Sequence, residues 1–350
     1  MKGLFFALVV VTYVASLPGT AAKSLSLNDG SVMIEMETDL LPAEKRKMDI
    51  IALASKLGCN EFVNHLPLFP DLDKLLRSEG PFTVVVPTDE AFETFYRDRR
   101  EYVKHAFPKI FSGHVVRGRV YSSQINNELL VPTALVWAGK PVNLRFNRYL
   151  DGKVTTATGS ILTLPDQNAT NGVIHVTDRV IYPQALYGFL TQMAEISNST
   201  GLFLAAIELT GLADVLTGES PFTLFAPSNK AIREMENPTF DELMSDRKQL
   251  TDVLLYHLVS GTIFEAGLRD GDVLTTMGGK QVRIEGSEND NKDDVRVNFV
   301  EIRVPDVAVT NGVFHIMAGV LMPPEVRNAY WKKNNVDVVS DFDKTLPWQF

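Results

Sequence analysis

Side chains that could do covalent or metal chemistry are scattered along this 350-residue chain. Its six histidines do not recur at the spacing of metal ligands, and no His-Glu-x-x-His segment occurs. A Gly-x-Ser-x-Gly nucleophile turn and a phosphate-binding glycine loop are also missing from the sequence. One acidic run lacks calcium-loop spacing and predicts a solvated loop: Glu288, Asp290, Asp293 and Asp294. We therefore expect no catalytic residues, no bound metal and no cofactor.

Cys59 is the only cysteine, so the chain cannot form an internal disulfide. Its folded state must then be stabilised by packing alone. An odd thiol in an oxidising compartment can pair between molecules, which would give a disulfide-linked dimer. The alternative is that Cys59 is a small buried hydrophobe.

The N-terminus has the pattern of a secretory signal. Lys2 precedes an apolar run over residues 4–17, and small residues follow at Thr20-Ala21-Ala22. The run is short for a membrane span, which needs about 20 apolar residues, although an uncleaved anchor is the alternative. Two sequons, at Asn168 and Asn198, are N-glycosylation candidates. We expect a secreted, extracellular glycoprotein.

A long internal repeat sets the domain organisation. The segment from Pro81 to Thr88 returns as Pro221 to Ser228, and Thr170-Asn171-Gly172-Val173 returns as Thr310-Asn311-Gly312-Val313. A period of 140 residues is too long for a solenoid repeat, which recurs roughly every 20–50 residues. The repeat therefore indicates a duplicated domain. The predicted divisions are a signal peptide (1–22), a linker (23–46), domain 1 (47–183), domain 2 (184–323) and a polar tail (324–350).

Each copy predicts helices first and strands later. Apolar residues at helical spacing open both copies, around residues 50–54 and 186–193. A β-rich run then ends in Pro-Thr or Pro-Ser, and the hydroxyls of Thr88 and Ser228 can cap a following helix. Alternating segments such as 142–146 and 282–284 predict strands in the second half of each copy. This order is typical of an α+β fold.

The net charge of −9 is unevenly distributed. Residues 47–183 carry 16 basic and 14 acidic side chains, a net of +2, whereas residues 184–323 carry 10 and 20, a net of −10. An acidic second half argues against nucleic acid and against heparin-like polyanions as ligands.

The repeated segments resemble the fasciclin family. The Pro-Phe-Thr segment, a central segment around His114 or His257, and the closing Thr-Asn-Gly-Val segment occur in that family's order, over residues 47–323. The resemblance implies two tandem α+β domains, each a wedge-shaped β-sandwich packed with helices. It also implies an extracellular adhesion or matrix protein, and not an enzyme.

The resemblance further implies two receptor-binding motifs. Longer members of the family use an Asp just before the Asn-Gly turn for integrin contact, which corresponds here to Asp306-Val307. A second motif, Tyr-His between bulky aliphatic residues, corresponds to Tyr256-His257. An exposed aspartate can complete the coordination of a receptor-bound cation. Alternatively, Asp306 only bonds local backbone, and Tyr256 and His257 lie in the core.

The first copy keeps both motifs less well. Asp166 is followed by the polar Gln167, and Gly113 precedes His114 in place of a tyrosine. A glycan at Asn168 would also mask the Asp166 loop. We therefore expect the second domain to bind a cell-surface receptor such as an integrin, or a matrix protein. The alternative is a carrier that holds a small hydrophobic or polysaccharide ligand.

Overall fold

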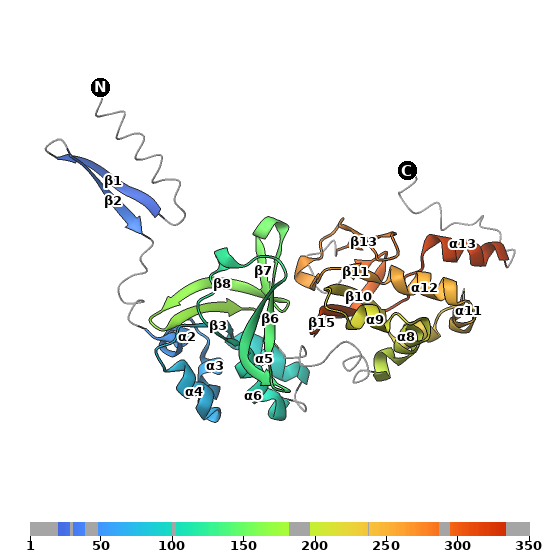
Figure 1. The fold of residues 1–350 in the computed structure, drawn as a ribbon, viewed down its shortest axis with the longest axis horizontal. Coiled ribbons are helices and arrows are strands. Elements are labelled where there is room, and N and C mark those ends of the chain that lie inside the picture. The colour runs from blue at the N-terminus through green and yellow to red at the C-terminus, as the bar shows by residue number, and fades with distance from the viewer. Residues whose placement is uncertain are drawn as a thin grey trace, which may run out of the picture.

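The structure, a computed structural model, describes residues 20–28, 31–38, 48–99, 103–181, 197–236, 238–286 and 295–333. Residues 1–19 of the predicted signal peptide and the junction at residues 182–196 lie outside these ranges. An antiparallel pair of strands, β1 (Thr20–Asn28) and β2 (Ser31–Thr38), lies mostly in the predicted linker. Strand β1 begins within the predicted signal peptide. Two domains follow along the chain (Figure 1).

Domain 1 has its helices before most of its strands, as the sequence predicts. Three short helices and a 3₁₀ turn precede the first strand, and two helices follow it. The elements are α2 (Ile50–Lys56), α3 (Asn60–His65), η2 (Leu66–Leu68), α4 (Pro70–Leu76), β3 (Phe82–Pro87), α5 (Asp89–Arg99), α6 (Val103–Gly113), β4 (Val115–Arg117), η3 (Ser122–Gln124), β5 (Leu129–Trp137), β6 (Lys140–Tyr149), η4 (Leu150–Gly152), β7 (Val154–Ala157), β8 (Ser160–Ala169) and β9 (Gly172–Thr177).

Domain 2 repeats this order, and the three strands in the middle of its sequence are shorter than those of domain 1. Its elements are α8 (Ser197–Thr210), α9 (Ala213–Thr217), β10 (Phe222–Pro227), α10 (Asn229–Arg233), α11 (Phe240–Ser245), α12 (Arg247–Tyr256), β11 (Leu258–Ser260), η6 (Glu265–Gly267), β12 (Val273–Thr275), β13 (Gln281–Glu285), β14 (Arg296–Val297), β15 (Val300–Val309) and β16 (Gly312–Met317). A further helix, α13 (Pro324–Lys333), occupies the start of the predicted polar tail. Val326 of this helix belongs to the core cluster of domain 2.

The strands of the two domains pair in the same cyclic order. In domain 1 they close into a barrel, and β3 pairs in parallel with β9. Irregularities in β5 and β8 let these long strands bend and pair on both sides, which joins the two faces of the predicted sandwich. In domain 2 a single bridge between Val259 and Thr276 completes the same circuit. The α+β class is confirmed.

The caps and turns that the sequence predicts are formed. Thr88 Oγ1 accepts a hydrogen bond from the Ala91 amide at 3.1 Å, and Ser228 Oγ accepts from Ala231 at 3.1 Å. Asn171 does more than make a turn, because its Nδ2 donates to the carbonyls of Leu76 (2.7 Å) and Ser78 (3.0 Å). Asn311 makes the equivalent bonds in domain 2. The repeated Asn therefore ties the helical end of each domain to its last strand.

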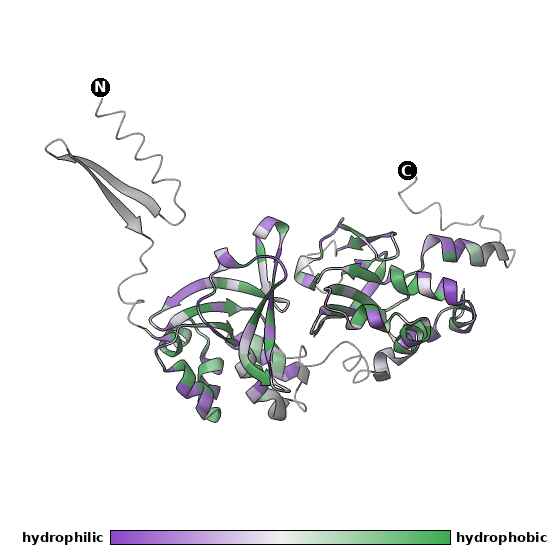
Figure 2. Cartoon of the chain, in the orientation of Figure 1, coloured by the Kyte–Doolittle hydropathy of each residue, from purple (hydrophilic) through white to green (hydrophobic). Residues whose placement is uncertain are grey.

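Hydrophobic side chains fill the space between the helices and the sheet in each domain. The central strands β3 and β10 are buried along their whole length. Figure 2 shows hydrophobic residues along these strands, and hydrophobic and hydrophilic residues alternating along the helices. Buried phenylalanines, including Phe62 and Phe111 with stacked rings 5.0 Å apart, dominate the helical side of domain 1.

Buried histidines occupy equivalent positions in the two domains. His114 Nδ1 donates to the Ile110 carbonyl (2.7 Å), and its Nε2 accepts from the Ile181 amide (3.1 Å). His257 makes the same pair of bonds with Val253 and Leu321. Burial lowers the pKa of both histidines to about 4. Each ring is therefore held neutral, in the tautomer that carries its proton on Nδ1.

We expect both domains to lose stability as the pH falls from about 6.5 towards 4. In this range the unfolded chain binds protons at these histidines while the folded chain does not, so the free energy of unfolding decreases with falling pH. Urea unfolding at pH 7.0, 6.0 and 5.0 would measure the slope, and His257→Gln should make it shallower. Equal slopes for the wild type and His257→Gln would contradict this assignment.

Candidate receptor-binding segment and the domain junction

Asp306 lies at a bulge in β15, in the left-handed backbone region with a φ of 61°. Its amide donates to His315 Nδ1 at 3.2 Å, and its Oδ1 accepts from the Glu265 amide at 2.7 Å. Asp166 repeats this arrangement in domain 1, with a φ of 58° and bonds to His175 and Ser122. Aspartate tolerates this backbone conformation better than most residues. The fold itself therefore accounts for an Asp at both positions.

The two aspartates differ in exposure. The Asp166 side chain is 34% exposed, whereas that of Asp306 is only 8% exposed. Arg179, which follows β9 of domain 1, lies across Asp306 with its Nη2 2.8 Å from Asp306 Oδ2. The same guanidinium lies 4.0 Å from Glu265 and donates to the Gly159 carbonyl at 2.6 Å. Domain 1 thus covers Asp306, the predicted receptor-binding aspartate. The sequence analysis expects this side chain to be exposed, whereas the structure buries it.

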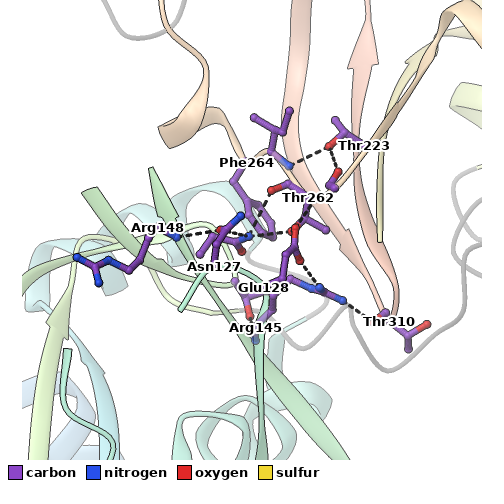
Figure 3. A network of polar contacts seen from close by, with 12 residues as sticks. Asn127, Glu128, Arg145, Arg148, Thr223, Thr262, Phe264 and Thr310 are labelled. Carbon is purple, nitrogen blue, oxygen red and sulfur yellow. Dashed lines mark hydrogen bonds and ion pairs between the residues drawn. The ribbon is translucent and has the colours of Figure 1, made fainter. Parts of the chain in front are cut away.

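A second polar contact joins the domains at Glu128, which follows η3 in domain 1. Its Oε1 accepts from both the amide and the hydroxyl of Thr262 at 2.6 Å each, as Figure 3 shows. Its other oxygen pairs with Arg145 of β6, and Arg145 also donates to the Thr310 carbonyl at 3.3 Å. Asn147 Nδ2 donates to the Thr262 hydroxyl at 2.9 Å. These bonds satisfy the polar groups of Thr262 at a position that is 2% exposed.

An aromatic contact lies between the two polar ones. The Tyr149 hydroxyl donates to the Thr262 carbonyl and accepts from the Phe264 amide, both at 3.1 Å. Burial is the main cause that raises the pKa of Tyr149. The Phe264 ring is 1% exposed and packs over Gly159 in the β7–β8 turn, where a Cβ would come within 2.6 Å of the ring. The junction therefore combines hydrogen bonds, an ion pair and close packing.

The other predicted receptor-binding residues lie inside domain 2. Val307 is 7% exposed and belongs to the main core cluster of that domain. Tyr256 is 3% exposed and donates to the Gln281 carbonyl at 2.9 Å, and His257 is fully buried. The alternative interpretation of Tyr256 and His257 as core residues with satisfied polar atoms therefore describes this structure. None of these contacts involves domain 1.

Cys59 is fully buried in the core of domain 1. Burial, and to a lesser extent Asp89, raises the pKa of its thiol to about 11. An intermolecular disulfide would require this core to open, so the structure does not support the dimer through Cys59 and agrees with the alternative of a small buried hydrophobe.

The glycosylation candidates remain predictions. Asn168 lies in β8, where its Oδ1 accepts from the Tyr121 hydroxyl at 2.8 Å. Asn198 lies in the first turn of α8, and the structure does not describe its side chain. The acidic run from Glu288 to Asp294 lies outside the described residues. Among the described residues, no cluster of metal-ligand side chains occurs, and no helix is long and apolar enough to cross a membrane.

The fasciclin domain profile matches residues 58–183 and 198–323, which lie within the two predicted domains. The chain belongs to the fasciclin family. Periostin from Homo sapiens is 26% identical over 267 residues, which cover 74% of this chain and 31% of periostin. Transforming growth factor-beta-induced protein ig-h3 from Sus scrofa is 27% identical over 285 residues, 79% of this chain and 40% of ig-h3. The chain thus spans less than half the length of either relative.

A solved structure also matches the domain pair. It is a fasciclin domain pair from the insect cell adhesion molecule fasciclin I, with 18% identity and a TM-score of 0.36. The match covers 77% of this chain and 98% of that one.

Sequence reasoning missed the residues of domain 1 that make the junction: Glu128, Arg145, Asn147, Tyr149, Gly159 and Arg179. A signal was present in the differences between the copies. The positions equivalent to Asn147 and Arg179 hold Glu285 and Gly319 in domain 2. Residues that differ in charge between duplicated domains are candidates for contacts that only one copy makes.

We expect Gly159→Ala to weaken the junction. A methyl group there would meet the Phe264 ring, and the residue has a φ of 84°. Gly139→Ala is the matched control, because Gly139 holds the same place in the β5–β6 turn with a φ of 78° and open space around it. Both variants place an alanine at a positive φ, which lowers the stability of each. The added contact with the Phe264 ring should make Gly159→Ala less stable than Gly139→Ala by about 1–3 kcal/mol. Thermal unfolding would measure this, and equal losses would contradict the packing of Phe264 on Gly159.

Proposed function

We propose that the chain is a secreted cell-adhesion or extracellular-matrix protein that binds a receptor of the integrin type, or a matrix component, through domain 2. Membership of the fasciclin family supports the adhesion class. The main support for this site is the position of Asp306, whose carboxylate lies at the edge of domain 2 against Arg179 of domain 1. The proposal includes no catalytic activity.

In this proposal, Asp306 is the residue that contacts the receptor. Its Oδ2 faces Arg179, whereas its Oδ1 is held by the Glu265 amide within domain 2. A displacement of domain 1 would uncover Oδ2 without disturbing Oδ1, and a carboxylate oxygen is a suitable ligand for a receptor-bound divalent cation. Adhesion would then depend on the equilibrium between a closed and an open junction.

Val307, Tyr256 and His257 would have a positioning role in the same proposal. Val307 anchors the strand directly after Asp306 in the core of domain 2. His257 accepts from the Leu321 amide and so attaches the end of α12 to the segment after β16. Separation of the domains would leave these side chains buried, because their contacts lie within domain 2.

We expect Arg179→Gln to increase the attachment of integrin-bearing cells to a surface coated with the protein. The substitution removes the charge that covers Asp306, and the open junction should become more populated. Asp306→Ala and the double variant should both fail to support attachment, and a chelator should abolish attachment to Arg179→Gln. Cell counts on coated surfaces would measure each effect.

The control for lost positive charge is Arg117→Gln, on the exposed face of β4. It should attach cells as the wild type does. Wild-type levels of attachment to folded Asp306→Ala would remove Asp306 from the site. A complete lack of attachment by every folded variant would overturn the receptor proposal itself.

We expect Asn168→Gln to leave attachment unchanged. Any glycan at Asn168 would lie two residues from Asp166, so its removal would uncover the weaker copy of the motif only. The same attachment assay, with protein from a glycosylating host, would measure the effect. A large gain would show that domain 1 also carries an adhesive site.

A further inference from the structure

The hairpin of β5 and β6 in domain 1 ends in an exposed apolar tip. Every residue from Val136 to Pro141 is exposed, in the order Val-Trp-Ala-Gly-Lys-Pro. The exposed fraction is 60% for Val136 and 37% for Trp137, the last two residues of β5. Contiguous exposed apolar side chains mark interaction sites, whereas singly scattered ones need no explanation.

The tip is part of the regular β-ladder. Val136 pairs with Pro141, and Trp137 pairs with Lys140, at the end of the hairpin. Since successive residues of a strand point to opposite faces, Val136 and Trp137 place one large apolar side chain on each face of the tip. Lys109 of α6 lies over the Trp137 indole, with its Nζ 3.7 Å from the ring centroid. The tip is therefore held against α6 before any partner arrives.

The charge around the tip is positive. The elements α6, β5 and β6 contain basic residues but no acidic one. Among the described residues, no carboxylate pairs with Lys109 or Lys140. Tryptophan is enriched at the boundary between water and membrane, and lysines beside it can reach anionic headgroups. An apolar tip with two lysines is thus suited to an anionic membrane surface.

Domain 2 has no such tip. Its equivalent hairpin, formed by β12 and β13, is shorter and folds back onto the domain, because the Met277 amide donates to the Leu258 carbonyl at 2.7 Å. Met277 packs against the core cluster of domain 2, and Lys280 pairs with Glu325. The fasciclin fold therefore does not require an exposed apolar hairpin end, which is a feature of domain 1.

The charge distribution of the chain favours one orientation on an anionic surface. Domain 1 carries a net charge of +2 over residues 47–183, and domain 2 carries −10 over residues 184–323. Such a surface attracts the first domain and repels the second. Glu128 and Tyr149, which contact domain 2, lie at the opposite ends of β5 and β6 from the tip. Docking through the tip therefore leaves the domain junction intact.

We propose that the β5–β6 tip docks domain 1 on a membrane surface that contains anionic phospholipids. Val136 and Trp137 enter the boundary between headgroups and acyl chains, and Lys109 and Lys140 contact the anionic headgroups around them. The apolar and electrostatic contributions act together, because a single weak membrane anchor gives only marginal binding. A sulfated polysaccharide would attract the same lysines but offers no apolar medium for the tip. This function goes beyond adhesion and does not depend on Asp306.

The test is flotation of the whole chain with vesicles made of equal parts of phosphatidylcholine and phosphatidylserine. We expect the protein to float with these vesicles, less so as salt is added, and to stay behind when phosphatidylcholine is the only lipid. The Lys109→Gln/Lys140→Gln variant should bind about tenfold more weakly, because each lysine near the surface contributes electrostatic attraction. Val136→Ser/Trp137→Ser should also lose about tenfold, because it removes the apolar contribution.

Matched controls lie elsewhere on domain 1. Leu68→Ser removes an apolar residue that is 68% exposed, and Lys74→Gln/Lys153→Gln removes two exposed lysines. Both should float as the wild type does. Absence of flotation, equal binding to phosphatidylcholine alone, or wild-type binding by either tip variant would overturn the proposal. Retention on immobilised heparin without flotation would assign the lysines to a polyanion and would overturn it as well.

Tryptophan fluorescence gives a readout of insertion itself. Trp331→Phe/Trp348→Phe leaves Trp137 as the only tryptophan of the chain. Its emission should shift to shorter wavelength when the phosphatidylserine vesicles are added, because the indole enters a less polar medium. Flotation without this shift would show that Trp137 stays in water and would overturn the role assigned to the tip.

Discussion

The carboxylate of Asp306 connects the internal structure of domain 2 to its attachment to domain 1. Its Oδ1 fixes the Glu265 amide and therefore the start of η6, which places Phe264 against the β7–β8 turn of domain 1. Its Oδ2 pairs with Arg179. A carboxylate that is only 8% exposed needs such partners, because burial without them costs several kcal/mol. The conformation of the bulge, the aromatic contact and the ion pair thus depend on one side chain, which is also the residue proposed to bind a receptor.

Most of the fold could be predicted from the sequence because its signals are local. The Pro-Thr and Pro-Ser caps, the helical spacing of α2 and the strands around residues 142–146 and 282–284 each depend on neighbouring residues. The junction could not be predicted in this way. Glu128 and Thr262 are 134 residues apart, and their contact requires two domains to meet at one angle. The burial of Asp306 could not be predicted for the same reason, because the side chain that covers it, Arg179, belongs to the other domain.

The duplicated turns show how two copies of one fold acquire different surfaces. The β7–β8 turn of domain 1 and the β14–β15 turn of domain 2 share positive φ values at both central residues. Gly159 leaves room for Phe264 and lets the domains approach closely. Phe299 at the same position projects a ring beside a groove, so domain 2 cannot repeat the contact that domain 1 makes. One backbone thus supports docking in the first copy and presents an exposed aromatic ring in the second.

The central claim is that domain 1 covers Asp306 by docking on domain 2 in one arrangement. The most direct measurement is the distance between spin labels at Lys153→Cys and Arg303→Cys, both exposed positions, while the buried Cys59 stays unlabelled. The account predicts one narrow distance distribution for the otherwise unchanged chain, and a broader, longer one when Arg179→Gln and Glu128→Gln are added. A broad distribution in the chain that retains Arg179 and Glu128 would contradict it.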